Sequence, residues 1–239
     1  MQPKAPIAIL CAMDSEVRSL IASLKTPSVQ THGGVDFHTG LLAERLAVVV
    51  RCGIGKVNAA RVTQMLIDLY APRVIINSGV AGGIAPELRI ADIVVATDLV
   101  EHDFDLTVFG NAKGYVFYGE SNREPSRFKS DPEWVQLLFK AAERVLGYGR
   151  VHTGTVVSGD RFIASTADKR ELREAFSATA AEMEGAAMAH VAALSEVPFV
   201  VLRAISDLAD GQAPESFETF ETKAAETGFA ILMEALSRA

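Results

Sequence analysis

This 239-residue chain has few of the features that mark secreted, membrane or nucleic-acid-binding proteins. It has only two cysteines, Cys11 and Cys52, both in apolar runs, so we expect no disulfide framework and a reducing compartment. No stretch approaches the roughly 20 apolar residues of a membrane-spanning helix. Lysine and arginine are not clustered and the net charge is −7, which disfavours nucleic acid and membrane surfaces as partners. We therefore expect a soluble, cytoplasmic protein with a small-molecule partner.

Apolar residues make up 49% of the chain, enough for one large α/β domain over residues 1–239. The run 5–13 is followed at once by acids, and Leu10 before Cys11 is too large for a lipidation cleavage site, so we interpret this run as a first strand. Strand-like and helix-like patterns then alternate, which predicts a largely parallel sheet covered by helices on both faces.

The hydrophobic periodicity places these elements along the chain. The expected strands cover residues 7–13, 35–39, 45–52, 73–78, 91–100, 151–158 and 197–205. The expected helices cover residues 14–24, 56–70, 131–146, 167–176, 184–194 and 216–237. Segment 101–130 is polar, rich in glycine and aromatic residues and without a steady period, which predicts a long functional loop.

Three acids stand at or just past the ends of apolar runs, in CAMDSEV (11–17), AEMEGAAMAH (181–190) and RAISDLAD (203–210). Ligands of α/β sheets bind outside the carboxyl ends of the strands, so we expect these acids to meet at one cleft. They are Glu16, Glu184 and Asp207. Three carboxylates around a cleft indicate acid–base chemistry on a polyhydroxylated or basic substrate.

Other motifs leave more than one interpretation open. Glu182 and Glu184 share a face if both lie on a strand, and otherwise Glu184 falls in the first turn of a helix, where a carboxylate favours the helix dipole. The glycine-rich GVAGGI (79–84) is either a backbone cradle for an anion or ribose or a plain strand-to-helix turn. GIGK (53–56) indicates a tight turn. HDFD (102–105) has no second histidine or cysteine at ligand spacing, so no metal is expected.

In combination, these segments resemble one known family. AMDSEV, GIGKVNAA, INSGVAGG, HDFDLTVFG, SGDRFI, AEMEGAAMAHVA and RAISDLAD, in this order and spacing, are similar to the motifs of the 5′-methylthioadenosine/S-adenosylhomocysteine nucleosidases. The resemblance covers nearly the whole chain and implies a single three-layer α/β/α domain around a mixed, partly barrel-like central sheet, assembled as a homodimer. It also implies hydrolysis of the N-glycosidic bond of both substrates, releasing adenine and the 5′-thioribose in methionine salvage, with no cofactor.

The resemblance implies a role for each catalytic acid. Asp207 protonates adenine N7, with Ser206 orienting it; Glu16 activates the attacking water; and Glu184 binds the ribose hydroxyls. These roles agree with the chemistry, because carboxylates stabilise an oxocarbenium-like sugar while an acid neutralises the departing base.

The resemblance also implies a set of substrate contacts. Phe162 stacks on adenine and the backbone of Ile163 reads its edge, while Met183 packs beneath the sugar and Arg203 lies near the water. The sugar and 5′-thio pocket is lined by Met13, Ile54 and Phe217, with Phe109 reaching in from the other subunit. The remaining implied contacts are Val80, Ala81, Gly82 and Glu182.

Two departures from the family pattern bear on rate and specificity. Val80 stands where many members carry a serine close to the nucleophilic water, so fewer hydroxyls hold the water and a lower rate is expected. The loop 111–125, with Tyr115, Phe117 and Tyr118, differs from the usual family loop and is expected to border the 5′ substituent. The preference among methylthioadenosine, S-adenosylhomocysteine, 5′-deoxyadenosine and aminodeoxyfutalosine therefore stays open.

Alternative functions are an aminodeoxyfutalosine nucleosidase, a purine nucleoside phosphorylase and a sensor without chemistry. A phosphorylase needs cationic or several amide donors for phosphate. The resembled family is part of the purine nucleoside phosphorylase/hydrolase superfamily, whose phosphorylases carry an arginine before the glycine-rich turn. This chain has Ile-Ile-Asn-Ser (75–78) there, and Glu16 would repel an anion. A sensor gains little from an acid aimed at a basic ring nitrogen. Hydrolysis is the preferred interpretation.

Overall fold

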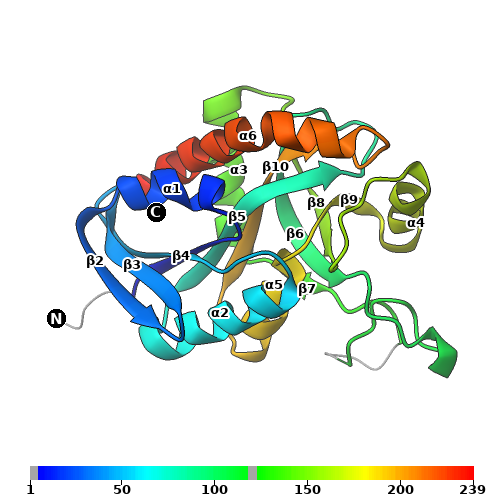
Figure 1. Ribbon diagram of the computed structural model, residues 1–239, viewed down its shortest axis with the longest axis horizontal. Helices are drawn as coiled ribbons and strands as arrows, with labels where there is room; N and C mark the ends of the chain where they lie inside the picture. The colour runs from blue at the N-terminus through cyan, green and yellow to red at the C-terminus, as the bar shows by residue number, and fades with distance from the viewer. Residues whose placement is uncertain (1–4, 118–122) are drawn as a thin grey trace.

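The computed structural model describes residues 5–117 and 123–239 as one sheet with helices on both faces (Figure 1). The strands are β1 (Ile7–Cys11), β2 (Lys25–His32), β3 (Val35–Leu42), β4 (Arg45–Arg51), β5 (Val74–Gly83), β6 (Ile93–Glu101), β7 (Phe128–Lys129), β8 (Val151–Ser158), β9 (Ala178–Glu182) and β10 (Phe199–Asp207). The helices are α1 (Asp14–Ala22), α2 (Lys56–Tyr70), η1 (Thr107–Phe109, a 3₁₀ turn), α3 (Pro132–Leu146), α4 (Thr166–Phe176), α5 (Gly185–Leu194) and α6 (Ala213–Leu236).

Part of the sheet closes on itself. The strands follow the order β10-β6-β8-β9-β5, and β5 pairs back onto β10. The ring contains parallel pairs, such as β5 with β10, and antiparallel pairs, such as β6 with β10. Beyond β5 the sheet continues through β1, β4, β3 and β2. The predicted α/β fold with a mixed, partly barrel-like sheet is therefore confirmed.

Two helix layers bury the two faces of the sheet (Figure 1). Helices α1, α3 and α6 lie on one face and share a core with the Ile7, Ile9 and Val49 side of the strands. Helices α2 and α5 lie on the other face, against the Leu10 and Val48 side. This alternation along β1 and β4 follows from the two-residue period of a strand. Helices bury both faces of the sheet, which explains why the central strands are continuous apolar runs in the sequence.

Residues 79–83 are strand, which corrects the expectation of a turn. They form the second half of β5 and pair with β10 and, at Gly82 and Gly83, with β9. The predicted strand 73–78 is thus too short. Glycine fits here because a Cβ on Gly82 would lie 2.9 Å from the Asp207 Oδ1 atom of the neighbouring strand. The glycines therefore allow close approach of side chains rather than a change of chain direction.

β10 carries an irregularity at its functional end. Its register against β5 shifts between Ile205, opposite Ala81, and Asp207, opposite Gly82. One extra residue in one strand re-aims the side chains that follow it. The shift places both Ser206 and Asp207 at the barrel end.

The sequence patterns missed three strands. β2 is polar and almost wholly exposed, and as an edge strand paired only with β3 it has no apolar alternation to detect. β9 is an alanine-rich run of five residues, and β7 has two residues within the expected loop 101–130, which also contains η1. None of the helices in the described ranges is long and apolar enough to cross a bilayer.

Candidate active site

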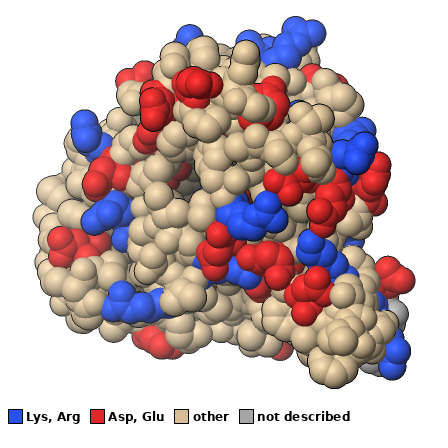
Figure 2. All heavy atoms as spheres, turned by 45° about the vertical axis from the view of Figure 1, so that its right-hand side comes forward, with Lys and Arg blue, Asp and Glu red and all other residues tan. Residues whose placement is uncertain are grey.

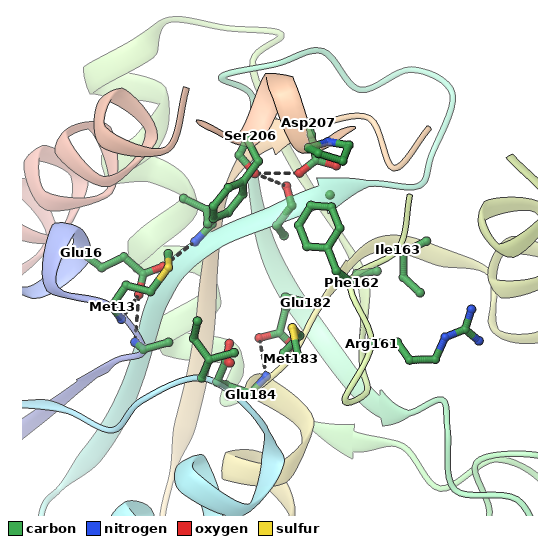
Figure 3. Close-up of a pocket in the computed structure, with 18 of the residues that line it drawn as sticks. Met13, Glu16, Arg161, Phe162, Ile163, Glu182, Met183, Glu184, Ser206 and Asp207 are labelled. Atoms are coloured by element: carbon green, nitrogen blue, oxygen red, sulfur yellow. Dashed lines mark hydrogen bonds between the residues drawn. The ribbon is translucent and has the colours of Figure 1, made fainter. Parts of the chain in front are cut away.

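A cavity of about 410 Å³ opens at the carboxyl ends of β1, β9 and β10, beside the second half of β5. Its lining contains all the predicted site residues except Arg203 and Phe109. Figure 3 shows Asp207 on one side of the cavity, Glu184 on the opposite side, Glu16 at one end and Ile163 at the other. The expected convergence of three distant carboxylates is thus present in the geometry.

Glu16 lies in the first turn of α1, directly after β1. Its Oε2 atom accepts hydrogen bonds from the backbone N–H groups of Ala12 (2.8 Å) and Met13 (3.0 Å), and its Oε1 atom accepts one from Val80 (3.1 Å). The side chain is 7% exposed. Burial raises the pKa of Glu16, while the nearby Arg203 and the three N–H donors lower it. Glu16 is therefore a buried carboxylate held by backbone donors and not a solvated charge on a helix surface.

Asp207 ends β10 and is 1% exposed. Its Oδ1 atom accepts from the Ala209 N–H at 2.9 Å, and its Oδ2 atom lies 2.9 Å from the Ser206 hydroxyl. That hydroxyl also lies 3.4 Å from the Ala81 carbonyl oxygen. Burial raises the pKa of Asp207, against these two hydrogen bonds. The Ser206 hydroxyl can turn toward the carbonyl when the acid is protonated and toward the acid when it is ionised.

Glu182 and Glu184 lie on different elements and make different contacts. They therefore neither share a strand face nor both serve the start of the helix. Glu182 ends β9, and its carboxylate accepts from the N–H groups of Glu184 (3.1 Å) and Gly185 (2.8 and 3.0 Å) at the start of α5. Glu184 is the residue before α5 and does not cap the helix with its side chain. Its Oε1 atom instead accepts from the Gly55 N–H at 2.7 Å. Glu182 stabilises the helix start, and Glu184 is left facing the cavity.

Arg203 lies outside the cavity lining, so its predicted position near the water and the sugar stays a prediction. The side chain is 1% exposed, and its guanidinium pairs with Glu182 and donates to the Asn77 side chain. Burial alone would lower the pKa of Arg203, but the carboxylates of Glu182 and Glu184 raise it. Arg203 therefore acts on the site through charge.

The rest of the lining is largely apolar. Phe162 and Phe217 meet edge to face with ring centroids 5.7 Å apart, and Met13, Ile54 and Met183 complete the walls. Figure 2 shows a hollow surrounded mainly by uncharged atoms. Such a site suits a flat, partly apolar ligand with a few polar groups.

Five residues of the lining were not predicted as site residues: Ala12, Ala181, Arg161, Pro214 and Glu218. All of them except Pro214 adjoin a predicted residue in the chain, so proximity to a predicted residue was the available signal. The described residues of the loop 111–125 do not line the cavity, so a contact of this loop with the 5′ substituent stays a prediction. Tyr118 lies outside the described residues. Across the ranges 5–117 and 123–239 no group of three metal-ligating side chains is placed to hold an ion.

Comparison with known proteins places the chain in a superfamily. Residues 6–237 match the family model of the phosphorylase superfamily. The fold agrees: the crystal structure of a 5′-methylthioadenosine/S-adenosylhomocysteine nucleosidase from Neisseria meningitidis in complex with methylthio-immucillin-A has a TM-score of 0.91 at 36% identity, covering 98% of this chain and all of the other. A Streptococcus pyogenes S-adenosylhomocysteine nucleosidase with 5-methylthiotubericidin has the same TM-score at 33% identity, covering 99% and 98%. The chain is a member of the phosphorylase superfamily.

Relatives in sequence identify the family within this superfamily. The chain is 41% identical over 219 residues to the 5′-methylthioadenosine/S-adenosylhomocysteine nucleosidase of Shewanella halifaxensis, covering 91% of this chain and 93% of the relative. The nucleosidase of Staphylococcus aureus strain JH9 is 40% identical over 220 residues, covering 92% and 93%. The chain therefore belongs to the 5′-methylthioadenosine/S-adenosylhomocysteine nucleosidase family.

The burial of Glu184 predicts a pH-dependent stability. Desolvation, with repulsion from Glu182, raises the pKa of Glu184 from 4.5 to about 7. The folded state thus binds this proton more tightly than the unfolded state, so the stability present below pH 4.5 is lost as the pH rises to about 7. Replacement by glutamine removes this loss, so Glu184→Gln should exceed the wild type in unfolding free energy by up to ~3 kcal/mol at pH 8.

Urea unfolding of both proteins at pH 4 and pH 8 measures this effect, and the difference should nearly vanish at pH 4. Glu226→Gln is the matched control, because Glu226 is exposed on α6. A Glu184→Gln protein that is less stable than the wild type at pH 8 contradicts the assignment of a strained, buried carboxylate.

Proposed function

We propose that this chain hydrolyses the N-glycosidic bond of 5′-methylthioadenosine and S-adenosylhomocysteine, releasing adenine and the 5′-thioribose. The observation that carries the proposal is the meeting of Glu16, Glu184 and Asp207 around one largely apolar cavity. The names of the relatives and the inhibitor complexes of the structural neighbours support the same substrates.

In this proposal Asp207 is the general acid. Adenine leaves poorly as an anion, so a proton delivered to N7 lowers the barrier to cleavage. The raised pKa of Asp207 keeps its proton available closer to neutral pH. Phe162 stacks on the base and the Ile163 backbone reads its edge, while Ser206 holds the acid in place at 2.9 Å.

Glu16 and Glu184 serve the sugar side. Glu16 is the proposed base that activates water: burial raises its pKa, which favours proton uptake, and three backbone N–H groups and the charge of Arg203 oppose that rise. Glu184 binds the ribose hydroxyls and stabilises the positive charge that develops on the sugar. Val80 supports Glu16 through its N–H at 3.1 Å but offers no hydroxyl to the water.

Water rather than phosphate is the proposed nucleophile. A phosphate needs cationic donors, and the arginine nearest to Glu16, Arg203, is already paired with Glu182 and bonded to Asn77. Glu16 would repel a phosphate approaching its side of the cavity. Hydrolysis therefore fits the charges better than phosphorolysis.

A homodimer completes the proposal. Beside the cavity mouth Ile54 is 53% exposed and Val57 is 77% exposed, and on η1 Val108 and Phe109 are 83% and 70% exposed. Figure 2 shows uncharged atoms on the lobe that projects at lower right, which carries the η1 segment. Large exposed apolar side chains indicate an interface. A cytoplasmic location and a role in methionine salvage are proposed from the family resemblance and from the two free, buried cysteines.

The first test is adenine release with and without phosphate. We expect release from both thioethers in phosphate-free buffer, at a rate that added phosphate does not change, and no 1-phosphate of the 5-thio-substituted ribose as a product. Chromatography of the bases and sugars measures both. Release that stops when phosphate is removed would falsify hydrolysis.

A second test concerns Asp207. Asp207→Asn keeps the shape but has no acidic proton, so turnover should fall by roughly 10²–10⁴-fold, the range for a positioned general acid. KM should change far less, because the contacts through Glu184 and Phe162 survive. Asp68→Asn, on the exposed face of α2, is the control. A folded Asp207→Asn enzyme that keeps more than about a tenth of the wild-type turnover contradicts the assigned role.

A third test concerns the dimer. Phe109→Ala should raise KM for the thioethers roughly tenfold, because it removes one buried aromatic contact. It should raise KM less for adenosine, which has a hydroxyl in place of the 5′-thioether. Tyr148→Ala, at an 89% exposed aromatic, is the control. Equal changes for both substrates, or full activity from a monomer in sedimentation experiments, would rule out a shared pocket.

A further inference from the structure

A cluster of charged side chains lies next to the cavity but outside its lining. It joins the motifs GIGK and HDFD through Lys56 and Asp103, two residues to which the proposed chemistry gives no role. The Lys56 Nζ atom donates to Asp103 Oδ1 at 2.5 Å and to Glu101 Oε2 at 3.3 Å. The three side chains are 18%, 25% and 11% exposed. An ion cluster with this much burial holds its geometry better than a surface pair, because solvent screens it less.

Backbone hydrogen bonds extend the cluster into a third loop. The Asp160 N–H donates to Asp103 Oδ2 at 2.9 Å, and the Lys56 N–H donates to Asp160 Oδ1 at 2.9 Å. Asp160 directly precedes the segment with Phe162 and Ile163. The cluster therefore ties the loop before α2, the end of β6 and the adenine-side loop to one another.

The network ends at the sugar-side carboxylate. Gly55, the residue next to Lys56, donates its N–H to Glu184 Oε1 at 2.7 Å. Gly55 has a φ of 101°, and a Cβ there would lie 3.1 Å from Asp160 Oδ1. The position of this N–H thus depends on a glycine conformation that the neighbouring Lys56–Asp160 contact holds in place.

From this geometry we propose that Lys56 and Asp103 are positioning residues for the reaction. They hold the Gly55 N–H against Glu184, and they fix the loop of Phe162 relative to the sugar site. The proposal rests on the proposed hydrolysis. A misplacement of about 1 Å caused by a change outside the reacting groups can cost up to 10²-fold in rate, so a network of this kind bears directly on turnover.

Lys56 is the cation that bridges the carboxylates of Glu101 and Asp103. Without it, Glu101 and Asp103 become two neighbouring, partly buried carboxylates, and the cation that bridges them is gone. His190 still lies 2.8 Å from Glu101, but Asp103 loses its lysine partner. Repulsion then favours separation of the loops and release of the Gly55 N–H from Glu184.

A double-mutant cycle tests the proposal. Lys56→Met and Asp103→Asn should each lower kcat/KM for methylthioadenosine by roughly 10- to 100-fold, mainly through kcat. If they act through Glu184, each should cost less than about threefold when introduced into Glu184→Gln, because the contact they position is already impaired. Lys25→Met is the matched control: Lys25 pairs with Glu44 on the exposed edge hairpin and should leave kcat/KM unchanged.

The outcomes separate this proposal from the proposed function. Adenine release by the wild type tests the function itself, whereas the cycle tests the network. Losses that add fully in the Glu184→Gln background overturn the proposal, as does wild-type kcat/KM in folded Lys56→Met. Circular dichroism establishes folding, and Asp103→Asn carries the test if Lys56→Met does not fold.

Discussion

Arg203 and Glu182 form an ion pair buried beside the cavity, and the other charges of the site depend on it. Arg203 is 1% exposed and Glu182 is 8% exposed, so neither charge is stable there without the other; breaking such a pair typically costs about 3–5 kcal/mol. Glu182 also binds the N–H groups that begin α5, which fixes the start of the helix behind Glu184. The positive charge favours the ionised form of Glu16 as well. One pair therefore sets both the geometry and the charge state of the sugar side.

The closed part of the sheet explains how residues distant in sequence reach the same cavity. β5 pairs with both β9 and β10, so its glycine-rich half lies between the strands that end in Glu182 and Asp207. A Cβ at Gly79 would stand 2.6 Å from Glu16 Oε1. Because the glycines of this strand have no side chains, the acids of the neighbouring elements can approach its backbone. The glycines are therefore a packing requirement of the site.

The sequence allowed the apolar strands and the three acids to be predicted because both have short-range patterns. β1 and β10 are buried runs; Glu16 follows β1 within a few residues, and Asp207 is the last residue of β10. What failed depends on contacts across the fold. Nothing local distinguishes Arg203 as a buried partner of Glu182, and the glycines of β5 read as a turn until two flanking strands are known. The link from Lys56 to Glu184 through Gly55 is likewise invisible without the closed sheet.

Glu16 and Asp207 differ in the hydrogen-bond and charge partners that surround each carboxyl group, and this difference fits their two proposed roles. Burial raises the pKa of Glu16, and three N–H donors and a nearby guanidinium oppose that rise. Asp207 has one N–H donor and a hydroxyl that can equally serve a protonated acid, and its neighbour Asp210 raises its pKa further. Burial thus raises the pKa of both carboxyl groups, while Glu16 has more hydrogen-bond donors and a cation among its partners. Cleavage of a glycosidic bond with a basic leaving group requires a proton donor beside the base and a proton acceptor beside the sugar, and the different partners of Asp207 and Glu16 fit these two tasks.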